Sequence, residues 1–161
     1  MPVIGLRFPE SSARTIKAES SEILTKTVVI HFFPNSWDMS KMIVKTVDDV
    51  DREVLYDPNA DLVVQEIGKL AGQYGAARIV IEGHADSSMK GRINAGLVKE
   101  LAQNRANSVK QAIVAKFNTL QPNQFSVSGV GWDVPADASD PNNHAKNRRV
   151  EIKVFPAEAP K

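Results

Sequence analysis

The stretch that decides the fold is GHADSSMKGRINAGLVKELAQNRANSV, residues 83–109. It follows the run RIVIE at 78–82, whose β-branched residues predict a strand that Gly83 ends. It leads into a pattern of helical spacing over 97–117. The apolar stripe expected on that helix comprises Leu101, Ala102, Val109, Ala112 and Ile113. A strand, a loop and a long helix are therefore predicted in succession.

Two charges stand out in this stretch. Arg105 falls between Leu101 and Val109, about 40° from each at 100° per residue, and so lies inside the apolar arc. In one interpretation its aliphatic stem lies along the edge of the core and its guanidinium reaches water. In the other the guanidinium is held in a fixed direction, where its planar set of N–H donors can bind a carboxylate. Asp86, just past the strand, either caps a turn or faces a ligand at the sheet edge. Together the two charges suit a zwitterionic ligand with an ammonium and a carboxylate on one carbon.

The flanking segments supply the remaining elements. Further strands are expected at 25–33, 125–130 and 149–155, and a helix at 57–75 with a buried face at Leu62, Val63, Ile67, Leu70, Ala71 and Tyr74. The segment 37–56 has no clear pattern, and its acidic run at 48–51 is expected on a solvated helix face or loop. The order βαβαββ predicts an α/β (α+β) sandwich, a small mixed sheet with helices packed on one face.

Composition narrows the class of protein. The chain has 161 residues, no cysteine and a net charge of +1, with no basic stripe, so we expect no nucleic-acid partner and no disulfide. No apolar run is long enough for direct membrane insertion. We expect an arm or linker remnant at 1–24 with a short edge strand at 3–8, one domain at 25–155 and a flexible tail at 156–161. The first residues lack a signal-peptide pattern, which favours a piece of a larger protein.

Four motifs carry a resemblance to a known family. They are VIEGHAD at 80–86, LAQNRANSVKQAIV at 101–114, VSGVGWDVPA at 127–136 and NRRVEIKV at 147–154. In this order they resemble the OmpA C-terminal-like family of OmpA, MotB and peptidoglycan-associated lipoprotein domains. The resemblance implies an OmpA-like domain that binds peptidoglycan without catalysis, cofactor or metal. It also implies a periplasmic, cell-wall-associated module that anchors a membrane-tethered parent protein, and it leaves a homodimer open.

The resemblance also assigns ligand-binding roles. Asp86 would receive the ammonium of diaminopimelate in the peptide stem, and Arg105 its carboxylate. Arg148, the first arginine of NRRVEI, would add a hydrogen-bond donor to the same binding site, whereas Arg149 would be structural. Asn35, in the turn after the first strand, and Ser88, just past Asp86, fall where family members contact ligand.

This chain departs from the family pattern around these residues. Ala85 stands where the family has a threonine, and Ala102 stands where it has a serine. Val98 stands where an asparagine often precedes that serine motif. One of three residues in the loop after Asp86 is expected to replace that asparagine: Lys90, Arg92 or Asn94. The segment 43–56 resembles an insertion. The departures bear on affinity and on the preference for diaminopimelate over amidated or lysine-type stems.

Two other functions remain open at this point. The departures would also fit a protein-interaction module that kept the fold and lost peptidoglycan binding. A metal-dependent enzyme is less favoured, because His84 and Asp86, which share one side of an extended segment, have no third ligand in any nearby motif. His84 is more simply a hydrogen-bonded turn residue.

Overall fold

The computed structural model describes residues 27–73 and 77–156, so the expected arm, its edge strand and most of the tail lie outside the described residues. The elements are β1 (Val28–His31), β2 (Met42–Val47), β3 (Val50–Leu55), α2 (Ala60–Gln73), β4 (Arg78–His84), α3 (Ala95–Lys116), a 3-10 turn η1 (Pro122–Gln124), β5 (Phe125–Gly131), α4 (His144–Asn147) and β6 (Arg149–Phe155). No helix among them is long and apolar enough to span a bilayer.

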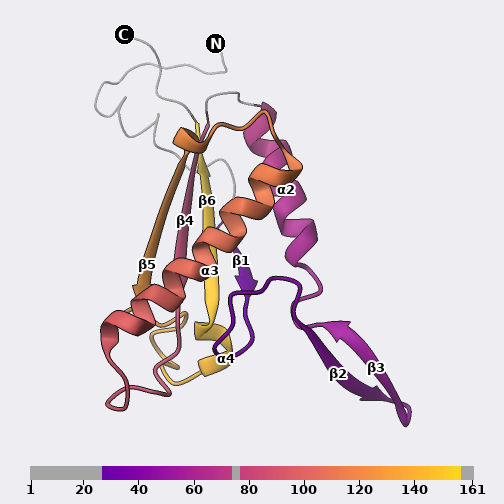
Figure 1. The fold of residues 1–161 in the computed structure, drawn as a ribbon, viewed down its shortest axis with the longest axis vertical. Coiled ribbons are helices and arrows are strands. Elements are labelled where there is room, and N and C mark those ends of the chain that lie inside the picture. The colour runs from indigo at the N-terminus through magenta and orange to yellow at the C-terminus, as the bar shows by residue number, and fades with distance from the viewer. Residues whose placement is uncertain (1–26, 74–76, 157–161) are drawn as a thin grey trace.

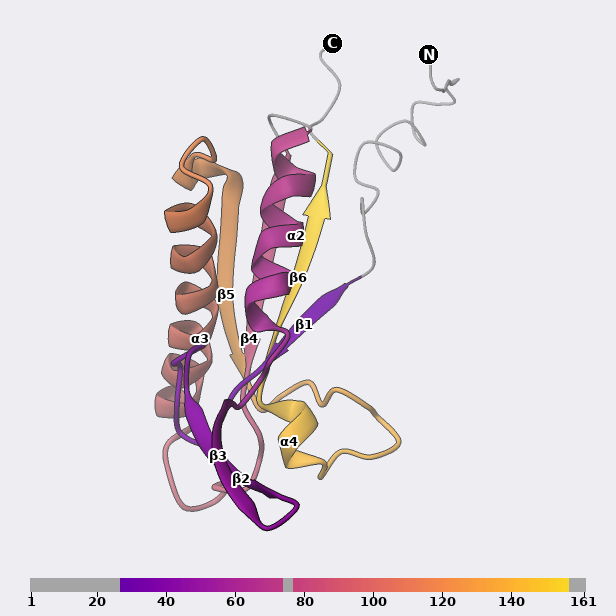
Figure 2. The ribbon, with the colours of Figure 1, turned by 90° about the vertical axis from the view of Figure 1, so that its right-hand side faces the viewer.

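Four strands form one mixed sheet in the order β1-β6-β4-β5. Strands β4 and β5 are parallel, whereas β6 is antiparallel to both of its neighbours. Helices α2 and α3 lie on the same face of this sheet (Figures 1 and 2). The expected α/β sandwich, a mixed sheet with helices on one face, is therefore confirmed.

The core lies between the helices and the sheet. Alternate side chains of β6, Val150, Ile152 and Val154, point into this core, and all three are 0% exposed. The expected buried face of α2 is wrong in part, because Leu62 is 57% exposed. Ile67 and Ala71 are buried as expected, and Tyr74 lies outside the described residues. The full buried set of the helix is Ala60, Val64, Ile67, Gly68 and Ala71. These residues follow the helical period from Ala60, which places Leu62 on the solvent side.

The segment without a clear pattern forms a separate β-hairpin, β2–β3, which extends away from the sheet (Figure 1). Its two-residue turn is Asp48-Asp49, with φ of 52° and 60°, as a type I′ turn requires. The expectation of a loop holds for this turn alone, and the alternative of a helix face is wrong. The pairing leaves large apolar side chains exposed at Met42, Val44, Val47 and Val50.

Helix α3 lies unusually close to the sheet at two paired glycines. Gly83 of β4 lies opposite Gly129 of β5. A Cβ on Gly83 would lie 1.8 Å from the carbonyl oxygen of Ala102, and one on Gly129 would lie 2.6 Å from backbone atoms of α3. Only glycine permits this approach, which sets α3 against the end of β4 and so places Arg105 at the sheet edge.

We therefore predict that Gly83→Ala lowers the free energy of unfolding by about 1–3 kcal/mol, because the methyl group overlaps rigid backbone. Gly72→Ala in α2 is the matched control, since nothing lies within 4 Å of its added Cβ. That control should leave stability unchanged or raise it by up to about 1 kcal/mol, as alanine favours a helix. Urea denaturation of the three proteins provides the measurement. Equal stability of Gly83→Ala and the wild type would contradict the close approach.

Candidate functional site

A cavity of about 470 Å³ opens where β4 ends, between the turn after β1 and the first half of α3. Its lining residues are Pro34, Asn35, Ala85, Asp86, Ser88, Met89, Ile93, Val98, Leu101 and Arg105. Four of the five residues predicted to bind ligand therefore meet in one hollow. The fifth, Arg148, does not line it but reaches it through Asp86.

Arg105 is the most deeply buried charge of the site, with 1% of its surface exposed. Its Nε donates to the carbonyl of Ser36 at 2.8 Å, and its terminal nitrogens donate to the carbonyls of His84 at 3.0 Å and Phe33 at 3.2 Å. The guanidinium is thus held in a fixed direction, and the interpretation in which it reaches back to water is wrong. These bonds use three of its five N–H groups, so one hydrogen remains on each terminal nitrogen.

No carboxylate of the described residues forms a hydrogen bond or ion pair with Arg105. Burial lowers the pKa of Arg105 to about 10, although the nearby charge of Asp86 raises it, so the guanidinium stays protonated at neutral pH. A buried cation whose partners are neutral carbonyls retains an uncompensated charge. The wall of the cavity beside Arg105 is accordingly suited to an anionic group.

Asp86 is held by two neighbours. Its Oδ1 accepts hydrogen bonds from the backbone N–H of Ser88 at 2.9 Å and from the Ser88 hydroxyl at 2.5 Å. Its Oδ2 accepts one from Arg148 at 3.2 Å. Burial alone would raise the pKa of Asp86, but the bonds from Ser88 and Arg148 bring it below its ordinary value. Asp86 therefore both shapes the turn and presents a charged carboxylate to the cavity.

Arg148 joins three parts of the chain behind Asp86. Besides the bond to Asp86, its Nε donates to the carbonyl of Phe32 at 3.0 Å and its Nη2 to the hydroxyl of Tyr56 at 3.0 Å. The Tyr56 ring also packs edge-on against Phe33, with centroids 5.5 Å apart. Sequence reasoning missed Tyr56. It follows β3 directly, so the hairpin interpreted as an insertion is tied to the site.

The remaining wall of the cavity is mostly apolar. Asn35 has a left-handed backbone conformation, with φ of 54°, which asparagine tolerates. This conformation makes the turn whose carbonyls, at Phe33 and Ser36, accept from Arg105. Ala85 and Val98 are 5% exposed and supply carbon where the family pattern has polar atoms. The expected replacement for the missing asparagine is not found among the lining residues. Asn94 instead caps α3, since its side chain accepts a hydrogen bond from Gly96 at 2.6 Å.

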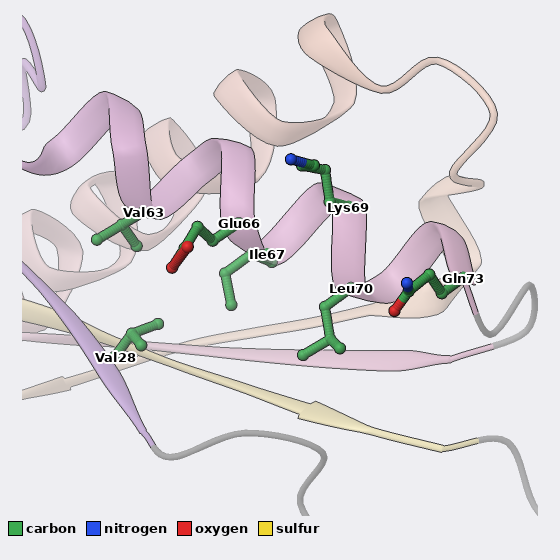
Figure 3. Close-up of a pocket in the computed structure, with 7 residues that line it drawn as sticks. All are labelled: Val28, Val63, Glu66, Ile67, Lys69, Leu70 and Gln73. Atoms are coloured by element: carbon green, nitrogen blue, oxygen red, sulfur yellow. The ribbon is translucent and has the colours of Figure 1, made fainter.

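Two other features do not belong to this site. A pocket of about 280 Å³ lies between α2 and the start of β1, where Ile67 and Leu70 point toward the sheet and Lys69 points away (Figure 3). No predicted ligand residue lines it. His84 and Asp86 also contact different partners, because the His84 imidazole contacts Glu82 whereas Asp86 contacts Ser88 and Arg148. The structure therefore gives no shared His84–Asp86 metal site.

Fold and cavity together define an α/β domain with a pocket of opposite charges at one edge of its sheet. The OmpA-like domain of FopA1 from Francisella tularensis subsp. tularensis SCHU S4 superposes with a TM-score of 0.60 at 13% identity, covering 83% of this chain and 75% of that one. The peptidoglycan-associated lipoprotein from Burkholderia pseudomallei gives a TM-score of 0.55 at 18% identity, covering 78% and 88%. Both likenesses concern the fold.

The sequence comparisons give the family. The model of the OmpA family matches residues 49–149, more than half of the chain, and the chain belongs to this family. Outer membrane protein Omp38 from Acinetobacter baumannii is 34% identical over 110 residues, which are 63% of this chain and 30% of that protein. The chain thus spans less than a third of the length of the curated relatives it matches.

The lowered pKa of Asp86 makes a prediction about stability. A carboxyl group with a depressed pKa in the folded state stabilises that state above its unfolded pKa, about 3.9, and the contribution disappears as pH falls through the folded value. We expect Asp86→Asn to be less stable than the wild type at pH 7, and the difference to shrink below about pH 4. Urea denaturation between neutral and acidic pH measures it. A difference that does not change with pH would contradict the assignment.

Proposed function

We propose that this domain binds peptidoglycan without catalysis, by gripping the free amino-acid end of diaminopimelate in the peptide stem. The observation that carries the proposal is that Asp86 and Arg105 line one cavity with opposite charges. The ligand ammonium would lie against the Asp86 carboxylate, and the ligand carboxylate would accept the hydrogens that remain on the terminal nitrogens of Arg105. Asn35 and Ser88 would contact the same head group from the rim.

Arg148 has a different role in this proposal from the one expected from the sequence. Its guanidinium is engaged by Asp86, the Tyr56 hydroxyl and the Phe32 carbonyl. It would therefore orient Asp86 and keep it ionised rather than contact the ligand first. The apolar side chains of Val98, Leu101 and Ile93 would pack on the aliphatic part of the diaminopimelate side chain.

The strength of a single contact can be bounded. Each hydrogen bond to a charged group contributes about 1.5–3 kcal/mol, and immobilising the ligand offsets much of the sum. Binding to one stem peptide would then be micromolar or weaker. A cell wall presents many stems to each parent protein, and this raises the effective concentration after the first contact.

The relatives support the wider setting. The Burkholderia structure is named a peptidoglycan-associated lipoprotein, and the Acinetobacter relative is named an outer membrane protein. We infer that this domain lies in the periplasm at the cell wall, as part of a parent protein tethered to the outer or inner membrane. Its role there would be to anchor that parent to the wall.

Sedimentation with purified sacculi tests the binding. We expect the wild type to sediment with the sacculi and Asp86→Asn and Arg105→Lys to remain largely in the supernatant. Asparagine removes the anion, and lysine keeps a positive charge but lacks the planar five-donor guanidinium that bonds three carbonyls and would still offer hydrogens to the ligand. Asp137→Asn is the matched control, since Asp137 accepts hydrogen bonds from the N–H and hydroxyl of Ser139 in the same type of turn but does not line the cavity.

Equal sedimentation of all four proteins would rule out this pair of charges as the wall-binding site. In that case the exposed apolar residues of the β2–β3 hairpin favour the second candidate, a protein-interaction module of the same fold. Circular dichroism of each variant shows whether a loss of sedimentation reflects unfolding instead.

Calorimetry with soluble peptides tests the ligand. A tripeptide that contains diaminopimelate should bind the wild type with a micromolar or weaker dissociation constant, and a matched peptide with lysine should bind more weakly. The reason is that lysine lacks the second amino-acid head group that the two charges would grip. Equal affinity for both peptides would show that the cavity does not distinguish diaminopimelate from lysine. Nanomolar affinity would contradict the expected micromolar or weaker binding of one stem peptide.

A further inference from the structure

A second group of polar side chains lies on the face of the sheet away from the helices. Gly83 of β4 faces α3, so its neighbours Glu82 and His84 point to the opposite face, where β6 places Glu151 directly across from Glu82. One ligand atom from each of these three side chains lies within 4.8 Å of the others. The closest pair is His84 Nε2 and Glu82 Oε1, at 2.9 Å.

We propose that Glu82, His84 and Glu151 form a binding site for Zn²⁺ that is separate from the peptidoglycan cavity. An imidazole nitrogen and two carboxylate oxygens are a ligand set that zinc accepts, with water completing a tetrahedral shell. Solvent reaches the site, because the side chain of Glu82 is 39% exposed and that of Glu151 is 22% exposed. None of the three residues lines the cavity of Asp86 and Arg105.

The electrostatics of this face favour a cation. Glu82 and Glu151 are direct cross-strand partners, an arrangement that destabilises a sheet when both carry the same charge. Arg149 offsets one of them through its Nε, 2.7 Å from Glu151 Oε2. Burial lowers the pKa of His84, and the nearby Arg149 lowers it further although the two glutamates raise it, so the imidazole is neutral at neutral pH. A neutral imidazole is the form that binds a metal.

The buried ring of His84 makes few hydrogen bonds. The ring is 0% exposed, and Nδ1 has no partner among the residues that the structure describes. The only hydrogen bond of the imidazole ring within that part of the chain joins its Nε2 to the partly exposed Glu82. A metal bound at Nε2 would take the place of the contact with Glu82 and would fix the ring proton on Nδ1.

The scaffold is suited to such a site. The ligands stand on two paired strands, whose hydrogen-bonded register from Arg78↔Phe155 to Gly83↔Val150 fixes the distances between their backbones. A bound ion would therefore link β4 to β6 near the end where His84 also offers its carbonyl to Arg105.

The test uses the untagged protein, freed of metal with a chelator and titrated with Zn²⁺ against a chromophoric competitor. We expect one equivalent to bind and the thermal midpoint to rise with the zinc concentration. The double variant Glu82→Gln/Glu151→Gln should lose more than about 100-fold in affinity, because even outer-shell partners of a metal contribute 10- to 100-fold. Glutamine preserves the shape of both side chains, and circular dichroism in chelator checks that the variant folds.

Two controls separate this site from other zinc ligands. His31→Gln removes the imidazole that lies 3.8 Å from Asp57, and Glu53→Gln removes an exposed carboxylate of the hairpin. Both should bind zinc like the wild type. Should the double variant fail to fold, NMR of the wild type replaces it, and zinc must then shift the His84 ring resonances. The proposal is overturned by an absence of saturable binding, by a folded double variant of wild-type affinity, by loss of binding in His31→Gln or Glu53→Gln, or by unshifted His84 resonances.

Discussion

The buried guanidinium of Arg105 is the interaction on which the rest of the structure at this edge depends. It collects three carbonyls, two from the turn after β1 and one from the last residue of β4, which lie far apart in the sequence. Burying an arginine is costly unless its donors have acceptors, and here neutral carbonyls accept from three of its five N–H groups. The turn is thereby fixed above the sheet, while the positive charge of the arginine stays available to a ligand. One side chain thus supports the fold and supplies half of the proposed binding site.

The second half of the site is stabilised differently. Asp86 is compensated by Arg148 and by the turn that Ser88 closes, so its charge persists in a partly buried position. Arg148 in turn depends on Tyr56 at the end of the hairpin. Among residues 27–73 and 77–156, Arg105 therefore has no anionic partner, whereas Asp86 is already paired with Arg148. For the proposed zwitterionic ligand, Arg105 would bind the carboxylate end, and Asp86 would bind the ammonium beside it.

Sequence reasoning succeeded where local patterns determine structure. The strand at 78–82, the long helix after it and the alternating final strand were all found, because β-branched runs and helical spacing are properties of neighbouring residues. It failed at the hairpin, whose turn uses two aspartates in place of the usual asparagine or glycine. It also placed Leu62 on the buried face of α2. The helix buries the face that contains Ala60 and Val64, and Leu62 lies on the opposite, solvent-exposed side.

The sequence by itself determined the order of elements, the family resemblance and the two charges worth attention. It could place Arg105 in an apolar arc, but not say whether its guanidinium reached water, because that depends on carbonyls supplied by residues about seventy positions away. Only the tertiary structure decided that Asp86 and Arg105 share a cavity. It also decided that Arg148 binds Asp86 without lining that cavity, and that Tyr56 binds Arg148. It alone brought Glu82 and Glu151 across from each other, since strand pairing joins positions that no local pattern connects.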